Sequence, residues 1–153
     1  MRIEPTDASS AEAQSLLAEY FSHLARTFPD GFDPDAGSTS SDPAEMSPPR
    51  GTFLVLREDD GTAVGCGGVK LLDDGRAEIK RMYLQPSTRG RGLGTLLLDA
   101  LEDAARSLGA TEGVLDTNAT LDAALALYRL HGWREVEAYN DNPYATHWFA
   151  KEL

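Results

Sequence analysis

The sequence contains a single cysteine, Cys66, so no disulfide bond can form within the chain. It has no run of about 18 apolar residues, which a membrane-spanning helix requires. Its first residues, MRIEPTDASS, lack the apolar stretch of a secretory signal. These absences predict a protein of a reducing compartment. We expect a cytoplasmic location and no membrane partner.

Basic residues are also scarce, since 14 Lys and Arg stand against 25 Asp and Glu and leave a formal net charge of −11. Proteins that bind nucleic acids present a basic face to the phosphate backbone, so we expect no nucleic-acid partner. A negatively charged surface attracts a cationic amine. The same charge is also typical of soluble proteins whose surface resists association. The length of 153 residues, of which 41% are hydrophobic, predicts a single domain over residues 1–153.

The apolar pattern predicts a mixed α/β chain. Turn signals at Asp60-Gly61 and Asp74-Gly75 separate three apolar runs and predict an antiparallel three-stranded meander. Ser9 and Glu12 have the spacing of a capping box at the start of a helix that Pro29 ends. The other expected helices cover residues 93–108 and 121–130, and the expected strands cover residues 2–4, 52–57, 63–72, 77–84, 111–118, 133–136 and 145–152.

Residues 30–49 are rich in Gly, Ser, Asp and Pro and show no apolar period. This composition predicts a long loop, or a short helix between loops. Loops of such length inside compact domains are usually functional lids or disordered segments.

A glycine-rich turn, Arg89-Gly90-Arg91-Gly92-Leu93-Gly94, lies between an expected strand and an expected helix. The first turn of a helix presents backbone N–H groups without intrahelical partners, so it stabilises a bound anion. The turn is not a P-loop, because no lysine occurs between Lys80 and Lys151. A dinucleotide fingerprint would need its third glycine where the chain has Thr95.

The pattern Arg89-x-x-Gly92-x-Gly94 resembles the pyrophosphate-binding motif of the GNAT superfamily of N-acetyltransferases. Downstream, the segment from Leu127-Tyr128 to Gly132-Trp133 resembles a second signature of the same superfamily. The resemblance covers roughly residues 50–153. It implies the α/β GNAT (acyl-CoA N-acyltransferase) fold, a mixed and mostly antiparallel sheet of six or seven strands flanked by helices.

The resemblance also implies an activity, the transfer of an acetyl group from acetyl-CoA directly to a primary amine. Acetyl-CoA is then a cosubstrate, and no metal is expected. The acceptor would be a small-molecule or peptide amine, and family analogy admits a homodimer. The sequence does not distinguish a polyamine, an amino acid, an aminoglycoside-like compound and a protein amine. By the same analogy, residues 30–49 lie beside the acceptor and help to choose it.

Two candidate catalytic residues follow from the resemblance. Glu78 would take the proton of the amine, or it is a surface carboxylate or a partner of Lys80. Tyr128 would protonate the departing coenzyme A sulfur, or it packs on a helical face with Leu125. The main chain of Met82, Tyr83 and Leu84 would hold the pantetheine arm and the oxyanion. The other expected cofactor-binding residues are those of the turn, Arg89, Gly90, Arg91, Gly92, Leu93, Gly94 and Thr95, together with Asn118.

Asn118 is expected to replace an asparagine of the family pattern that this chain lacks. Many members carry Asn seven residues before the tyrosine, where this chain has Leu121. Tyr144, His147 and Trp148 are candidates for the acceptor pocket, although a lone histidine in a strand is more often structural. Cys66 is a poor candidate nucleophile, because no basic neighbour is evident.

Two other functions stay open. A non-catalytic acyl-CoA-binding sensor or interaction module would keep the fold and lose the acceptor chemistry. A nucleotide-binding protein could use the same glycine turn.

Overall fold

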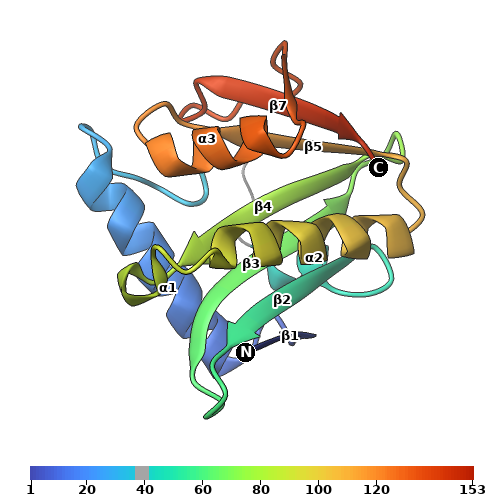
Figure 1. The fold of residues 1–153 in the computed structure, drawn as a ribbon. Helices are drawn as coiled ribbons and strands as arrows, with labels where there is room; N and C mark the ends of the chain where they lie inside the picture. Colours follow the sequence, from blue (N-terminus) through green and yellow to red (C-terminus); the bar gives the residue numbers. More distant parts are fainter. Residues whose placement is uncertain (37–41) are drawn as a thin grey trace.

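The computed structural model describes residues 1–36 and 42–153 and shows a twisted seven-stranded sheet (Figure 1). The strands lie in the order β1-β2-β3-β4-β5-β7-β6. Among the described residues, only β4 and β5 run parallel, and the other neighbouring pairs are antiparallel. The strands are β1 (Arg2–Pro5), β2 (Gly51–Arg57), β3 (Ala63–Leu71), β4 (Ala77–Leu84), β5 (Glu112–Thr117), β6 (Arg134–Val136) and β7 (His147–Glu152). This is the mixed, mostly antiparallel sheet expected from the sequence.

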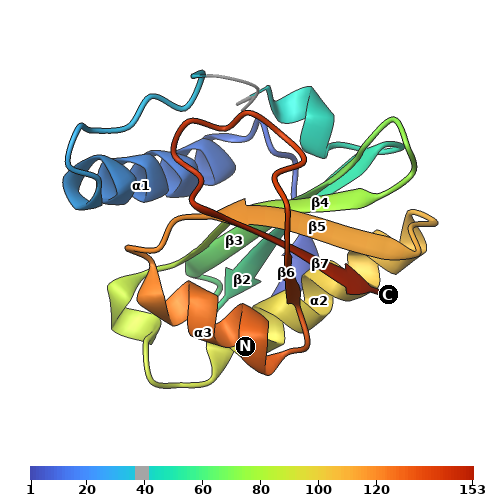
Figure 2. The same ribbon diagram turned by 90° about the horizontal axis from the view of Figure 1, so that it is seen from above.

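Helices cover both faces of the sheet. Figure 2 shows α1 (Ala11–Thr27) on one face and α2 (Leu93–Ser107) and α3 (Asp122–Leu130) on the other. The larger apolar core lies beneath α2 and α3, where Leu97, Leu98 and Leu101 are fully buried. A smaller core lies beneath α1, around Leu16 and Phe53. Two short 3₁₀ helices, η1 (Pro43–Met46) and η2 (Pro86–Thr88), stand before β2 and α2.

The predicted strands and helices are confirmed, with ends that shift by at most a few residues. The meander of β2, β3 and β4 is antiparallel as expected. The expected N-cap at Ser9 is wrong, since Ser10 Oγ accepts from the backbone N–H of Ala13 at 3.2 Å. Ser9 instead donates its backbone N–H to Asp7 Oδ1 at 2.8 Å, which forms an Asx turn just before the helix. The N-cap of α1 is therefore Ser10, one residue after the expected Ser9.

The segment predicted as a long loop or a short helix between loops contains η1. Asp42 caps it by accepting from the Ala44 N–H at 2.9 Å. Residues 37–41 lie outside the described residues, so the expectation that residues 30–49 choose the acceptor is untested over that stretch.

Strand β4 leaves its neighbour β5 soon after the two begin. The parallel pairing joins Ala77 to Gly113 and Glu78 to Val114, and in the described part of the chain it goes no further. Along its other edge β4 stays paired with β3, but with a bulge, since Arg81 and Met82 together stand opposite Gly67. Arg81 has a φ of +58°, which is uncommon for a residue other than glycine. The bulge bends β4 away from β5 and opens the sheet.

A buried carboxylate fastens α2 to the far end of the sheet. Glu102, which is 3% exposed, accepts from Lys151 Nζ at 2.7 Å and from Trp133 Nε1 at 3.3 Å. Lys151 belongs to β7, and Trp133 follows α3. A single side chain of α2 therefore connects three parts of the fold.

We predict that Glu102→Ala lowers the free energy of unfolding by roughly 3 kcal/mol, because it leaves Lys151 and the Trp133 N–H without this partner. Chemical denaturation measures the change. Asp103→Ala is the matched control, since its carboxylate lies on the same helix with a 78% exposed side chain and pairs only at the surface. It should change stability by less than about 0.5 kcal/mol. Equal losses in the two variants would contradict the role given to Glu102.

Candidate active site

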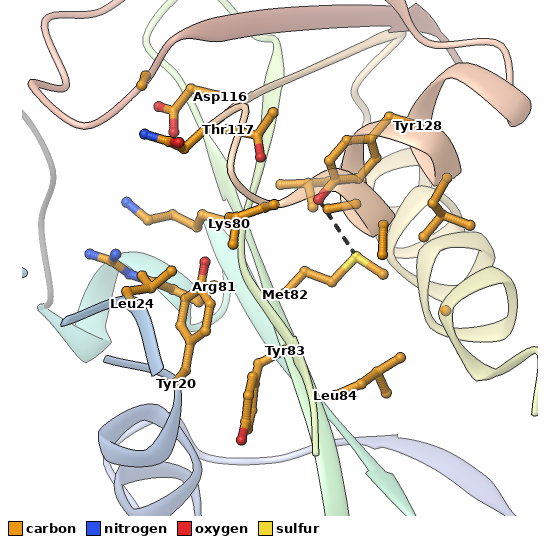
Figure 3. A pocket seen from close by; sticks show the side chains of 18 of the residues that line it. Tyr20, Leu24, Lys80, Arg81, Met82, Tyr83, Leu84, Asp116, Thr117 and Tyr128 are labelled. Atoms are coloured by element: carbon orange, nitrogen blue, oxygen red, sulfur yellow. Dashed lines mark hydrogen bonds between the residues drawn. The ribbon is translucent and has the colours of Figure 1, made fainter. Parts of the chain in front are cut away.

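A cavity of about 980 Å³ occupies the opening between β4 and β5 (Figure 3). Residues of β4 form one wall, and the end of β5 with the turn after it forms another. The turn before α2 and part of α3 close one side, while α1 and the loop that follows it close the other. The cavity thus reaches both faces of the sheet, and β4 separates its two halves.

The glycine-rich turn opens α2 at the edge of this cavity. Gly92 is the N-cap of the helix with a φ of +73°, and Gly90 has a φ of +79°. A Cβ at either position would meet no other atom within 4 Å. Glycine is needed here for the left-handed backbone rather than for space. Because the N-terminus of α2 borders the cavity at Leu93, Gly94 and Thr95, its backbone N–H groups can bind an anion there.

Ten of the eleven expected cofactor-binding residues line the cavity, and Arg91 does not. The Arg91 guanidinium pairs instead with Glu58 of the β2–β3 turn, at 2.6 Å from its Oε1. Thr95 Oγ1 lies 3.1 Å from Nε2 of His131, which joins the start of α2 to the end of α3. In β4, Met82 and Leu84 pack toward the α2 side, whereas Tyr83 packs against Tyr20 of α1. Tyr83 therefore borders the other half of the cavity.

Asn118 has a structural role at the end of β5. Its side-chain amide donates to the backbone carbonyl of Tyr144 at 2.6 Å. Its side-chain oxygen accepts from the Thr120 N–H at 2.9 Å. Asn118 lines the cavity, but its polar atoms hold the turn before α3 to the loop before β7.

Tyr128 reaches the cavity from α3. Its ring is buried beside Trp133 and Phe149, as the packing alternative expected. Its hydroxyl, however, points into the opening and donates to Met82 Sδ at 3.9 Å (Figure 3). A thioether sulfur is a weak acceptor, so a stronger acceptor can replace it. Burial raises the pKa of Tyr128 above its ordinary value, so the hydroxyl is protonated at neutral pH.

Glu78 is 8% exposed and borders the cavity at the point where β4 and β5 separate, so it is not a surface carboxylate. Its Oε2 accepts from the hydroxyl of Tyr139 at 2.7 Å, and its Oε1 lies 3.7 Å from Lys80 Nζ. Burial and the Glu78 carboxylate both raise the pKa of Tyr139, which keeps that hydroxyl a donor. The two contacts fix the orientation of the Glu78 carboxylate.

Sequence reasoning missed Asp116 of β5, which faces the same space. Its carboxylate accepts from Asn140 Nδ2 at 2.6 Å and Asn142 Nδ2 at 3.0 Å. Burial raises the pKa of Asp116, while these two amides oppose the rise. A carboxylate directly after the apolar pair Val114-Leu115, within an expected strand, is the signal that could have found it.

Sequence reasoning also missed two of the cations that line the cavity, Lys80 and Arg81. Burial lowers the pKa of both groups. Arg81 carries its guanidinium 5.0 Å from the centre of the Phe21 ring in α1. No sequence signal marks the backbone conformation of Arg81, because a bulge depends on the pairing of two strands.

An aromatic cluster of Phe28, Phe32 and Tyr144 lines the cavity on the α1 side. The ring centres of Phe32 and Tyr144 lie 4.8 Å apart, and those of Phe28 and Tyr144 lie 5.7 Å apart. The Tyr144 hydroxyl accepts from the backbone N–H of Asp33 at 2.8 Å. Of the three residues expected near the acceptor, Tyr144 alone borders the cavity in the described residues.

His147 and Trp148 are used elsewhere. Trp148 donates its indole N–H to Asn140 Oδ1 at 2.9 Å, and His147 Nδ1 lies 2.8 Å from Thr146 Oγ1. Their expected place in the acceptor pocket is wrong, because β7 lies beyond β5 from the opening. Cys66 is buried against α1, and burial raises the pKa of its thiol to about 12, which keeps it unreactive.

Comparison with known proteins agrees with these features. The model of the acetyltransferase (GNAT) family matches residues 15–133. An uncharacterized N-acetyltransferase of Schizosaccharomyces pombe is 41% identical over 100 residues, which are 65% of this chain and 61% of that protein. The match thus spans less than two thirds of that relative. An IAA acetyltransferase of Azospirillum brasilense is 33% identical over 131 residues, which are 85% of this chain and 84% of that protein.

Solved structures share the whole fold. A candidate acyl-CoA N-acyltransferase from Klebsiella pneumoniae superposes with a TM-score of 0.78 at 29% identity, covering 99% of this chain and 97% of that one. The PaiA N-acetyltransferase from Thermoplasma acidophilum, solved with coenzyme A, superposes with a TM-score of 0.72 and covers 100% of both chains. Its 19% identity supports the fold alone. Among the residues that the structure describes, no helix is long and apolar enough to cross a membrane.

Proposed function

Because the chain belongs to the GNAT family of acetyltransferases and is an acetyl-CoA-dependent N-acetyltransferase, we propose that its two substrates meet in the opening between β4 and β5. The observation that carries the proposal is the cavity itself. It joins the N-terminus of α2, the hydroxyl of Tyr128 and the carboxylate of Glu78 in one space. The acceptor is a primary amine on a small molecule or peptide. A cytoplasmic location, a single domain and a homodimer stay predictions.

The residues on the α2 side fit coenzyme A. The left-handed Gly90 and Gly92 turn the backbone N–H groups at the start of α2 toward the cavity edge, where a pyrophosphate is stabilised by the helix dipole. Separation from β5 leaves one edge of β4, from Met82 to Leu84, beside the cavity. An extended amide-bearing chain such as pantetheine can pair with such an edge. Acetyl-CoA supplies the activated acetyl group as a thioester.

Tyr128 assists departure of the thiolate. Its hydroxyl is protonated and donates to the weakly accepting thioether sulfur of Met82. It can therefore turn to the sulfur of coenzyme A as negative charge develops there. The pKa of a tyrosine lies above that of a thiol, and burial raises the pKa of Tyr128 further. Complete transfer of the Tyr128 proton to the thiolate is therefore uphill. The hydrogen bond to sulfur is therefore the larger part of the role.

Glu78 removes the proton that the amine carries at neutral pH. An ammonium group has no lone pair for attack, so a base must act first. Tyr139 and Lys80 hold the carboxylate at the cavity wall, close to the point where the strands part. A proton can reach it directly or through water.

We predict that Gly92→Ala weakens acetyl-CoA binding about tenfold, because alanine resists the φ of +73° that turns the helix N-terminus toward the ligand. Isothermal titration measures the Kd. Gly61→Ala is the matched control, with a φ of +91° and equal free space in the β2–β3 turn. Both variants should lose about 1 kcal/mol of stability, and only Gly92→Ala should lose affinity. An unchanged Kd would exclude the turn from the site.

We predict that Tyr128→Phe lowers kcat roughly 10²-fold and leaves acetyl-CoA binding intact, since only the hydroxyl is removed. The assay follows release of the coenzyme A thiol against a panel of primary amines. Tyr20→Phe removes another hydroxyl from the cavity lining and should lower kcat far less. If the two variants behave alike, Tyr128 has only a packing role. Binding of acetyl-CoA without turnover by the native protein would favour a sensor.

We predict that Glu78→Gln lowers kcat/KM about 10²-fold at pH 7. The deficit should shrink as the pH rises toward the amine's own pKa near 10, because the free amine then no longer needs the base. A pH profile of both proteins with one acceptor tests this. Asp74→Asn, at the cavity edge, serves as the control and should keep the native profile. A deficit independent of pH would assign Glu78 a structural role.

A further inference from the structure

The half of the cavity on the α1 side joins an acidic end to an aromatic wall. Resting on the proposed function, we propose that the acceptor is a ring-bearing amine, which is a primary amine joined to an aromatic ring by a short carbon chain. Asp116 binds its ammonium group. The aromatic cluster of Phe28, Phe32 and Tyr144 receives its ring.

The aromatic wall is the first observation. Its three pairs of ring centres lie 4.8, 5.7 and 5.9 Å apart, and all three rings line the cavity. Phe32 and Tyr144 are half-buried, and in the described part of the chain they belong to neither of the apolar cores beneath the helices. Part of their apolar surface therefore faces the cavity. A ligand ring can pack there in the offset or edge-on arrangements that aromatic pairs prefer.

The acidic end is the second observation. Glu78 and Asp116 both line the cavity, next to the point where β4 and β5 separate. The charge of Glu78 is partly balanced by Lys80, whose Nζ lies 3.7 Å from Oε1. Asp116 accepts its two hydrogen bonds from the neutral amides of Asn140 and Asn142, so it keeps its negative charge for an ammonium group. Each carboxylate oxygen accepts more than one hydrogen bond, which leaves room for that group.

One asparagine connects the acidic end to the aromatic wall. Asn142 Nδ2 donates to Asp116 Oδ1 at 3.0 Å, and Asn142 Oδ1 accepts from the backbone N–H of Tyr144 at 3.0 Å. The Tyr144 hydroxyl in turn accepts from the backbone N–H of Asp33, next to Phe32. The carboxylate and the rings are therefore held a single side chain apart. This separation suits an amine with only a short chain before its ring.

A polyamine is the main competing acceptor, because aromatic rings also attract cations. A cation already uses the rings behind the wall, however. The Arg81 guanidinium lies 5.0 Å from the centre of the Phe21 ring, and that centre lies 5.6 Å from the centre of the Phe32 ring. An aminoglycoside would place hydroxyl groups against apolar rings and lose their hydrogen bonds to water. A ring is the group that gains most from this wall.

The proposed reaction balances in atoms and protons. The amine nitrogen forms a bond to the acetyl carbon while the bond from that carbon to the coenzyme A sulfur breaks. Of the three protons of the ammonium group, one leaves through Glu78, one ends on the coenzyme A thiol and one stays on the amide nitrogen. Asp116 holds the ammonium group before its first proton leaves.

The test compares amines that differ in the group behind the nitrogen. Phenethylamine and benzylamine are assayed beside ethylamine, spermidine and a short peptide with an N-terminal alanine. The readout is release of the coenzyme A thiol, with identification of the N-acetyl product. We expect kcat/KM for at least one ring-bearing amine to exceed that of ethylamine by about 10²-fold, because removal of a phenyl ring from water favours binding by about that factor. It should also exceed the values for spermidine and the peptide.

The native protein decides between the outcomes. Equal or better use of ethylamine, spermidine or the peptide would overturn the ring-bearing amine and leave the acetyltransferase function intact. Absence of release with every amine would contradict the proposed function instead. Binding then decides the acceptor separately. With coenzyme A present, phenethylamine should raise the melting temperature more than ethylamine at the same concentration, and an equal effect of the two amines would overturn the proposal.

A variant of the wall assigns the ring site. Phe32→Ala should reduce the ratio of kcat/KM for phenethylamine to that for ethylamine about tenfold, whatever happens to the absolute rates. Phe21→Ala is the matched control, because Phe21 packs on Phe32 but does not line the cavity in the described residues. It should keep the native ratio. An unchanged ratio in Phe32→Ala, or an equal change in both variants, would overturn the assignment of the ring.

A second variant assigns the ammonium site. Asp116→Asn should raise KM about tenfold for phenethylamine and ethylamine alike, because both carry the ammonium group and a neutral amide attracts it less. An unchanged Kd for acetyl-CoA shows that the variant is folded. Asp122→Asn removes the same charge from an exposed residue that also lines the cavity, and it should keep the native KM. A native KM in Asp116→Asn, or an equal rise in both variants, would overturn the role of Asp116.

Discussion

The separation of β4 from β5 after the pair Glu78–Val114 is the constraint on which the site depends. A sheet that stayed paired along its full length would place side chains of α2 and α3 against closed backbone, with no room for substrate. The bulge at Arg81 makes the separation possible, because it bends β4 while the β3 pairing continues on both sides of it. The cavity is therefore a property of backbone geometry before any catalytic side chain is considered.

The two sides of β4 bind by different physical means. On the α2 side, backbone dipoles and left-handed glycines face the cavity edge, and these groups cannot be neutralised by a change of pH. On the α1 side, formal charges and aromatic rings dominate, and burial alters the pKa of Lys80, Arg81 and Asp116. Anion binding at the start of α2 therefore depends on the backbone of the turn rather than on a charged side chain. The charge of the α1 side therefore depends on single side chains.

Much of the fold follows from local sequence signals. Asp-Gly turns fix the meander, and the apolar period of the segment after Gly92 fixes α2, because these signals act over a few residues. The glycine turn and Tyr128 were found by motif, and both border the cavity.

Lys80, Arg81 and Asp116 were not found, since their roles depend on the pairing of β4 with β3 and β5, which no local pattern encodes. His147 and Trp148 were candidates for the acceptor pocket from their place in the last strand, but neither lines the cavity, because β5 separates β7 from the opening.

The contact between Tyr144 and the loop after α1 has a consequence for any exchange of segments between this chain and its relatives. The Tyr144 hydroxyl binds Asp33, and its ring packs on Phe28 and Phe32, so segments 111 residues apart share one pocket wall. A recombination or loop graft that replaces only one segment breaks this wall. An exchange that keeps this wall intact must therefore carry both segments.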